Sequence, residues 1–272
     1  MKKIINISSR LFPNTMAYFA YKTLTNPKLK KSNIHEIDIL DKAYKEKILF
    51  RKFNIQFYQW GEPNNDPILL IHGWEGNSGN FADIIESLVE QNYYVLAFDG
   101  PSHGFSTKKQ TNLLEFSDLI IFILQQYHIK KIISHSFGSM ITTYALSRIP
   151  HFEIDKYILM TTPDTFLERI NSISSQVGIN EKTKQILIRK LEAELHTEVT
   201  KICVSEFVKE IHVKEALILH DKEDKIIPIR QARIVNENWI NGNLEELENT
   251  GHFRILKEQF VIERIINFLK SN

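Results

Sequence analysis

The sequence predicts an α/β protein with a mostly parallel, doubly wound sheet of about eight strands and an inserted helical cap. Short, wholly apolar segments such as Ile68–Ile71 are typical of strands that are buried on both faces of a parallel sheet. Segments with apolar residues at helical spacing alternate with these strands along the chain. This alternation stops between residues 164 and 210, where only helical patterns occur.

The first sixty residues do not follow the alternation. Apolar side chains recur at helical spacing over residues 12–24, which predicts an amphipathic helix that packs on the main domain. Residues 28–44 are charged, and we expect them to form a loop. Residues 48–53 and 55–60 alternate in type, which predicts an antiparallel strand pair that turns at Asn54.

The alternating part of the chain supplies the central elements. Strands are predicted at 67–71, 94–98, a short run ending at Ile132-Ile133, 157–160, 216–220 and 244–247. Helices are predicted at 78–91, 113–127, 137–146, 228–239 and the carboxyl terminus. Because long connections between such strands are needed only where the chain crosses over, this order favours parallel pairing.

Three parts follow from this organisation. We expect an amino-terminal helical extension over residues 1–47. The α/β core then comprises residues 48–163 and 211–272, and residues 164–210 form two or three helices inserted between strands. An insertion over the carboxyl ends of the strands would act as a cap, and ordinary helical packing on the flank of the sheet is the alternative.

The composition limits the classes of partner. The 272 residues include 34 Lys and Arg against 33 Asp and Glu, so a formal charge of +1 gives no reason to expect nucleic acid as a partner. A single cysteine, Cys203, excludes an intrachain disulfide and suits a reducing compartment, so a cytoplasmic location is predicted.

The same sequence predicts no transmembrane segment and no cleaved signal peptide. No apolar run approaches the roughly 18–20 residues that a membrane span needs. Polar residues interrupt the apolar run soon after Met1-Lys2-Lys3. A weak contact of the helix at 12–24 with a membrane surface or a partner stays open as the alternative to packing on the main domain. The oligomeric state is not predicted.

The segment 130–146 carries the strongest functional signal. A buried strand that ends at Ile133 is followed almost at once by a helix that begins at Phe137, so Ser136 must occupy a tight corner. Small neighbours, among them Gly138, let the helix pack close behind this corner. Such a strand–turn–helix is the geometry of a nucleophile elbow at the carboxyl edge of a sheet.

A serine nucleophile needs a base and an acid that orients the base. His252 follows Gly251 in a tight loop after the last strand, which makes it the best candidate base. Asp221 and Asp224 both follow the preceding strand, and we favour Asp224 as the acid because Asp221 is suited to holding the turn. The three candidates follow one another in the order serine, acid, histidine, which is one of the known chain orders of a catalytic triad.

Two backbone N–H groups are expected to stabilise the developing oxyanion. Phe137 supplies one, because it follows the serine at a helix start. Trp74 supplies the other, because Gly73 permits a close approach of its loop. His72 is expected to be a buried structural residue. No carboxylate or second histidine stands at metal-ligand spacing beside His103 or His135, so neither a metal nor another cofactor is predicted.

Five segments in this order resemble the α/β-hydrolase superfamily over most of the chain, from about Ile48 to the carboxyl terminus. They are Leu70-Ile71-His72-Gly73-Trp74, residues 99–106, Ser134-His135-Ser136-Phe137-Gly138, residues 220–228 and Thr250-Gly251-His252-Phe253. The resemblance implies an α/β-hydrolase fold. It also implies roles for Ser136 as nucleophile, Asp224 as acid, His252 as base, and Trp74 and Phe137 as oxyanion donors. Ser134 and Ser102 stand where this family usually has glycine.

The predicted function is that of a serine hydrolase, similar to a carboxylesterase. It would cleave a small-molecule carboxylic ester or related acyl substrate through a Ser-His-Asp triad and an acyl-enzyme. Two alternatives remain because one fold hosts many chemistries: a C–C hydrolase, lyase or peptidase on the same fold, or a non-catalytic binding protein.

Overall fold

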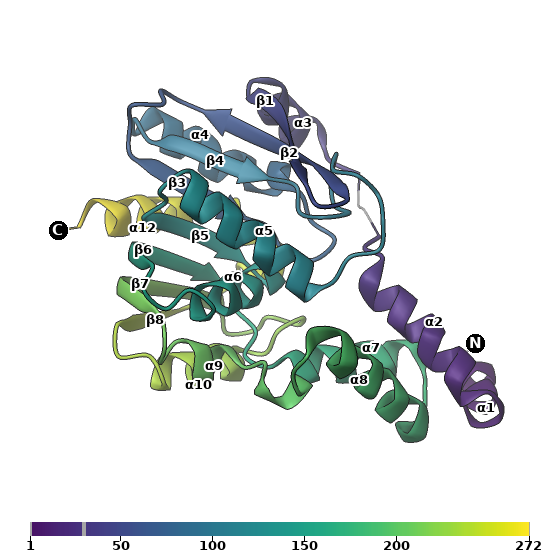
Figure 1. Ribbon diagram of the computed structural model, residues 1–272. Helices are drawn as coiled ribbons and strands as arrows, with labels where there is room; N and C mark the ends of the chain where they lie inside the picture. Colours follow the sequence, from purple (N-terminus) through teal and green to yellow (C-terminus); the bar gives the residue numbers. More distant parts are fainter. Residues whose placement is uncertain (1, 29–30, 272) are drawn as a thin grey trace.

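The computed structural model describes residues 2–28 and 31–271, which form one eight-stranded sheet flanked by helices (Figure 1). The sheet order is β1-β2-β4-β3-β5-β6-β7-β8. The strands are β1 (Tyr44–Phe50), β2 (Phe53–Trp60), β3 (Pro67–Ile71), β4 (Tyr94–Phe98), β5 (Lys131–His135), β6 (Glu153–Met160), β7 (His212–Asp221) and β8 (Gly242–Leu247). β2 runs antiparallel to both neighbours, and every pairing from β4 to β8 is parallel. The predicted doubly wound, mostly parallel sheet is therefore confirmed.

Helices cover both faces of the sheet. They are α1 (Lys2–Leu11), α2 (Pro13–Thr25), α3 (Ile34–Asp41), α4 (Ala82–Glu90), α5 (Leu113–Gln126), α6 (Phe137–Ser147), α7 (Phe166–Val177), α8 (Glu181–Leu195), α9 (Val204–Phe207), α10 (Ile229–Glu237), α11 (Gly251–Arg254) and α12 (Gln259–Lys270). Two short 3₁₀ turns, η1 (Ser78–Phe81) and η2 (Val199–Lys201), complete the described elements. α3, α4 and α12 pack on one face, and α5, α6 and α10 pack on the other.

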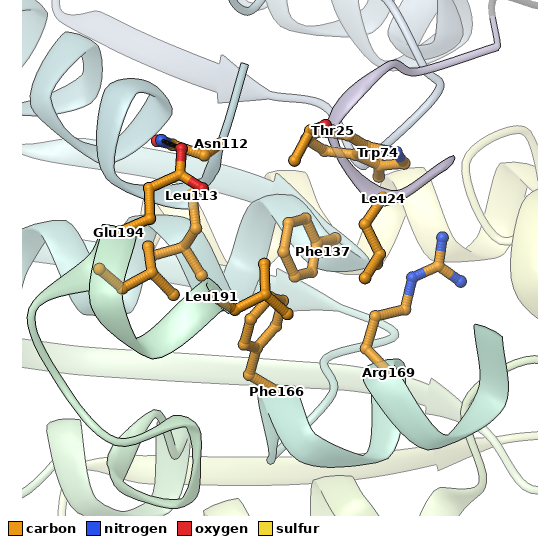
Figure 2. A pocket seen from close by; sticks show the side chains of 11 residues that line it. Leu24, Thr25, Trp74, Asn112, Leu113, Phe137, Phe166, Arg169, Leu191 and Glu194 are labelled. Atoms are coloured by element: carbon orange, nitrogen blue, oxygen red, sulfur yellow. Dashed lines mark hydrogen bonds between the residues drawn. The ribbon is translucent and has the colours of Figure 1, made fainter. Parts of the chain in front are cut away.

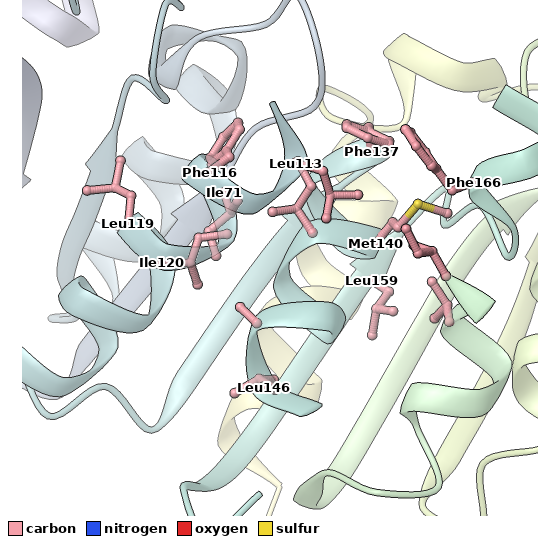
Figure 3. Packing of buried hydrophobic residues seen from close by; sticks show 14 of the residues in the cluster. Ile71, Leu113, Phe116, Leu119, Ile120, Phe137, Met140, Leu146, Leu159 and Phe166 are labelled. Atoms are coloured by element: carbon pink, nitrogen blue, oxygen red, sulfur yellow. The ribbon is translucent and has the colours of Figure 1, made fainter. Parts of the chain in front are cut away.

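The apolar core has a layer on each side of the sheet. The larger layer continues from α5 and α6 into the helices of the insertion, where Phe137 and Phe166 pack at a centroid distance of 5.9 Å (Figure 3). Met140 and Leu159 lie beneath them, both fully buried. The floor of the insertion is therefore continuous with the core behind the elbow.

The amino-terminal region differs from the prediction in two places. Residues 28–44 were expected to form a loop, but they include α3, which begins with a capping box in which Asn33 and Glu36 bond each other's backbone N–H groups. The strand pair turns at Arg51, which adopts a left-handed φ of 51°, so the expected turn at Asn54 is wrong. Asn54 lies within β2, opposite Leu49.

The amino-terminal helices pack against the insertion. Tyr21 of α2 donates a hydrogen bond to Glu194 of α8 at 2.7 Å. Thr183 of α8 donates to the carbonyl of Ser9 in α1 at 2.9 Å. α7, α8 and α9 occupy the predicted insertion, while the division of the chain into three domains stays a prediction. No helix among the described residues is both long and apolar enough to span a bilayer.

Candidate active site

Ser136 lies on the sharp corner between β5 and α6. Its φ of 56° and ψ of −128° are strained for a residue with a side chain, and its N–H donates to the Met160 carbonyl at 2.8 Å. α6 passes directly behind β3, because a Cβ on Gly138 would lie 2.5 Å from the His72 carbonyl oxygen. The corner therefore holds a half-buried serine hydroxyl outward at the carboxyl edge of the sheet.

Ser134 fits below the elbow in the place where glycine is usual. Its side chain is fully buried, and its hydroxyl lies 3.0 Å from the Ser139 hydroxyl and 3.1 Å from the Tyr157 hydroxyl. Tyr157 in turn donates to the Ser139 carbonyl at 3.1 Å. A serine is tolerated here because neighbouring polar groups satisfy its hydroxyl.

Three side chains from different loops form a continuous hydrogen-bonded chain. The Oγ of Ser136 lies 3.0 Å from Nε2 of His252, and Nδ1 of His252 lies 2.7 Å from Oδ2 of Asp224. His252 and Asp224 are only 8% and 6% exposed, whereas Ser136 is more accessible. The three residues singled out in the sequence as nucleophile, base and acid are thus brought together.

The two candidate acids have different surroundings. The Oδ1 of Asp224 accepts hydrogen bonds from the N–H groups of Ile226 and Ile227 at 2.7 and 3.0 Å, which leaves Oδ2 for His252. Both oxygens of Asp221 instead accept from backbone donors. Oδ1 accepts from Glu223, and Oδ2 accepts from Thr250 and Gly251. Asp221 therefore ties the loop after β7 to the loop that carries His252.

Asp224 retains its charge despite burial. Burial alone would raise its pKa, but the hydrogen bond from His252 and the electrostatic attraction between the two groups, together with two backbone N–H groups, hold the pKa below its usual value. Burial of Asp221 is likewise outweighed by backbone hydrogen bonds, so its pKa is also lowered. Both groups are ionised at neutral pH.

Two further histidines support this arrangement. The Nε2–H of His135 donates to the His252 carbonyl at 2.9 Å, and the Nε2–H of His220 donates to the Ile227 carbonyl at 2.8 Å. Burial, followed by the charge of His252, lowers the pKa of His135 to about 3, so its ring is neutral at ordinary pH. This role of His135 has no signature in the sequence, because a contact across 117 positions leaves no local pattern.

The loop after β3 approaches the elbow closely. A Cβ built on Gly73 would lie 3.0 Å from Cβ and 3.5 Å from Oγ of Ser136, so a side chain at this position would crowd the serine. Trp74 follows in the same loop, and its ring lies edge-on to that of Phe137 at 5.8 Å. As the first residue of α6, Phe137 has an N–H without an acceptor inside the helix. The two residues predicted as oxyanion donors thus lie beside the serine.

The loop after β4 braces the loop after β3. The N–H of Gly100 donates to Nε2 of His72 at 2.9 Å, and Asp99 accepts from both the N–H and the hydroxyl of Ser78 at 2.8 and 2.9 Å. Ser102 has a left-handed φ of 69°, which accounts for the glycine that is usual at this position. Within the described residues, no group of three His, Cys, Asp or Glu side chains is placed to bind a metal.

A mostly apolar pocket adjoins Trp74 and Phe137. About 440 Å³ of space lies in and above this pocket, part of it open to solvent, and α2, α7 and α8 contribute most of the remaining wall (Figure 2). Its lining residues from these helices are Leu24, Thr25, Phe166, Arg169, Leu191, Glu194 and Leu195. Tyr21 and Asn112 hold Glu194 by hydrogen bonds. The extension and the insertion therefore share one cavity beside the candidate catalytic groups.

Comparisons with known proteins agree with this architecture. Residues 66–178 match the family model of the alpha/beta hydrolase fold. A serine hydrolase-like protein of Homo sapiens is 28% identical over 115 residues, which cover 40% of this chain and 56% of that protein. The chain thus spans about half the length of the human relatives that it matches, or less.

Solved structures extend the likeness over nearly the whole chain. An esterase of Pyrococcus furiosus has a TM-score of 0.63 at 18% identity, covering 91% of this chain and 97% of that one. A bacterial membrane phospholipase A has a TM-score of 0.66 at 14% identity, covering 97% and 94%. At these identities the likeness shows the fold alone. Together with the eight-stranded sheet and the family match, it identifies the chain as an α/β hydrolase fold protein.

Proposed function

We propose that this chain is a serine hydrolase that cleaves a carboxylic ester or a related acyl substrate. The observation that carries the proposal is the hydrogen-bonded chain from Ser136 through His252 to Asp224. Similarity to a serine hydrolase-like protein supports it. The cytoplasmic location expected from the single cysteine stays a prediction.

In the proposed reaction, His252 removes the proton of the Ser136 hydroxyl as the oxygen attacks the acyl carbonyl. Asp224 keeps His252 in the tautomer with hydrogen on Nδ1 and stabilises the imidazolium that forms. His252 then donates its proton to the departing alcohol. Water, activated by the same histidine, releases the acid from the acyl-enzyme.

The N–H groups of Trp74 and Phe137 are proposed to bind the carbonyl oxygen as it becomes negative. Their value lies in being positioned before the reaction, because the elbow and the close contact of Gly73 fix both backbone segments. The adjoining apolar pocket is proposed to receive the acyl chain. A chain-length series of p-nitrophenyl esters tests the proposal, and absence of turnover with every member would contradict it.

Filling the acyl pocket is expected to shorten the preferred chain. Leu191 of α8 lines this pocket, and a Leu191→Trp substitution would occupy part of its volume. We expect kcat/KM for the octanoyl ester to fall about tenfold or more, with the acetyl ester changed less than about twofold. Ile186 of the same helix does not line the pocket, so Ile186→Trp is the control. Equal losses for both esters would place the acyl chain elsewhere.

His135 is expected to act as a positioning residue for His252. Removing its hydrogen bond to the His252 carbonyl in a His135→Ala variant should lower kcat about 10- to 100-fold with KM nearly unchanged, because the base loses its alignment. His135→Gln should recover most of the activity, since an uncharged amide can donate the same hydrogen bond. Steady-state kinetics check this, and equal activity of the Ala and Gln variants would contradict it.

A further inference from the structure

The amino-terminal segment has a charge distribution unlike that of the rest of the chain. Seven of the 34 Lys and Arg residues lie within the first 35 positions, and none of the 33 Asp and Glu residues does. The side chains of Arg10, Lys22, Lys28 and Lys31 are exposed, and none forms an ion pair with another described residue. A near-neutral protein thus has one strongly basic region.

The same segment exposes large apolar side chains. Five large side chains of the α1–α2 segment, which we call the apolar set, are each at least half exposed, from 50% for Tyr18 to 67% for Leu11: Ile7, Leu11, Phe12, Tyr18 and Phe19. They belong to the end of α1, the junction and the first half of α2. Figure 1 shows these two helices projecting from the body at the side away from β8. Exposure of several large apolar side chains within one short segment is typical of an interaction surface.

The other face of the α1–α2 segment packs against the rest of the protein. Ala17, Ala20 and Tyr21 are buried among the core residues that include those of α8. The Ser9 carbonyl accepts from Thr183, and Tyr21 bonds Glu194. Packing within the protein therefore accounts for the buried side chains of α2 but not for the exposure of the apolar set. These contacts also fix the α1–α2 segment to the helices around the pocket.

We propose that the α1–α2 segment docks the protein on an anionic lipid bilayer. The apolar set enters the boundary between headgroups and acyl chains, and the basic side chains face the lipid phosphates. A bilayer fits better than a second copy of the chain, because two copies of a surface with unpaired cations and no carboxylate would repel each other. Apolar insertion combined with basic side chains is the usual requirement for stable binding at a membrane surface.

The docking surface is connected to the pocket. Leu24 and Thr25, at the carboxyl end of α2, line the pocket together with Trp74 and Phe137 (Figure 2). α2 thus carries two residues of the apolar set, Tyr18 and Phe19, in its first half and contributes to the pocket wall at its carboxyl end. Resting on the proposed function, this implies that acyl substrates come from the lipid surface, while docking itself requires no catalysis.

Co-sedimentation with vesicles tests the docking. The 272-residue chain should bind vesicles containing phosphatidylglycerol and should bind pure phosphatidylcholine at least about tenfold more weakly, with the difference reduced by salt. Phe12→Asp combined with Phe19→Asp, and separately Arg10→Glu combined with Lys22→Glu, should each weaken binding about tenfold or more. Turnover of a soluble acetyl ester should be unchanged in both.

The control removes exposed apolar side chains elsewhere. Leu49 and Ile240 are 74% and 97% exposed and lie outside the α1–α2 segment. A variant that combines Leu49→Asp with Ile240→Asp should therefore bind vesicles as the parent protein does. Absence of binding to anionic vesicles overturns the proposal. So does a dimer in light scattering that only the Phe12 and Phe19 substitutions dissociate, without vesicle binding. Vesicle binding by a protein without esterase activity would reject the proposed function and keep the docking.

Discussion

A Ser136→Ala variant is expected to lose about 10⁵-fold in kcat toward every ester that the parent protein hydrolyses. The hydroxyl oxygen is the atom that would form the acyl-enzyme, and alanine leaves His252 without a group to deprotonate. A fluorophosphonate probe should therefore label the parent protein and leave the variant unlabelled. Single-turnover kinetics should show alcohol release in the parent alone.

The neighbouring serine provides the matched control. Ser134 lies two positions earlier, in β5, and its hydroxyl is buried below the elbow against Ser139 and Tyr157. Ser134→Gly should keep the labelling and activity within about tenfold, because it changes support for the corner and not the reacting group. Labelling of the Ser136→Ala variant, or loss of labelling in Ser134→Gly alone, would reject Ser136 as nucleophile.

Much of the architecture could be predicted because the parallel strands are short, apolar and separated by helical patterns. Ile68–Ile71 and Ile132-Ile133 are such cases, and both lie in the sheet where expected. The sheet edge on which the candidate triad meets follows from this alone, since all parallel strands end there. The sequence therefore indicated which loops to compare, although it could not give the distances between their side chains.

The errors arose where local signals were weak or overlooked. Helix α3 was not predicted because the charged residues of this segment are typical of a loop. The spacing of Asn33 and Glu36 is nevertheless that of a capping box. The turn between β1 and β2 falls at Arg51, because the strand pairing of β2 includes Asn54. The bond from His135 to the His252 carbonyl and the contacts of Ser134 with Tyr157 depend on tertiary packing, so no reading of neighbouring residues predicts them.

Asp224→Asn is expected to lower kcat about 10⁴-fold while the protein stays folded. The asparagine oxygen can still accept from Ile226 and Ile227, so the loop keeps its backbone hydrogen bonds. Its amide would face Nδ1 of His252 as a donor and would favour the tautomer with hydrogen on Nε2. That tautomer cannot accept the Ser136 proton. Kinetics together with thermal melting measure both effects.

Asp221→Asn should have the opposite profile. Both Asp221 oxygens accept from N–H donors, so an amide nitrogen must oppose one of them, and we expect the free energy of unfolding to fall by about 2 kcal/mol. Because the folded-state pKa of Asp221 lies below its usual 3.8, its carboxylate stabilises the fold above that pH and loses this effect as pH falls through the lowered pKa. The Asn variant should lack that part of the acid sensitivity in unfolding experiments. A Tm-neutral Asp221→Asn with a 10⁴-fold loss in kcat, beside an active Asp224→Asn, would reverse the two assignments.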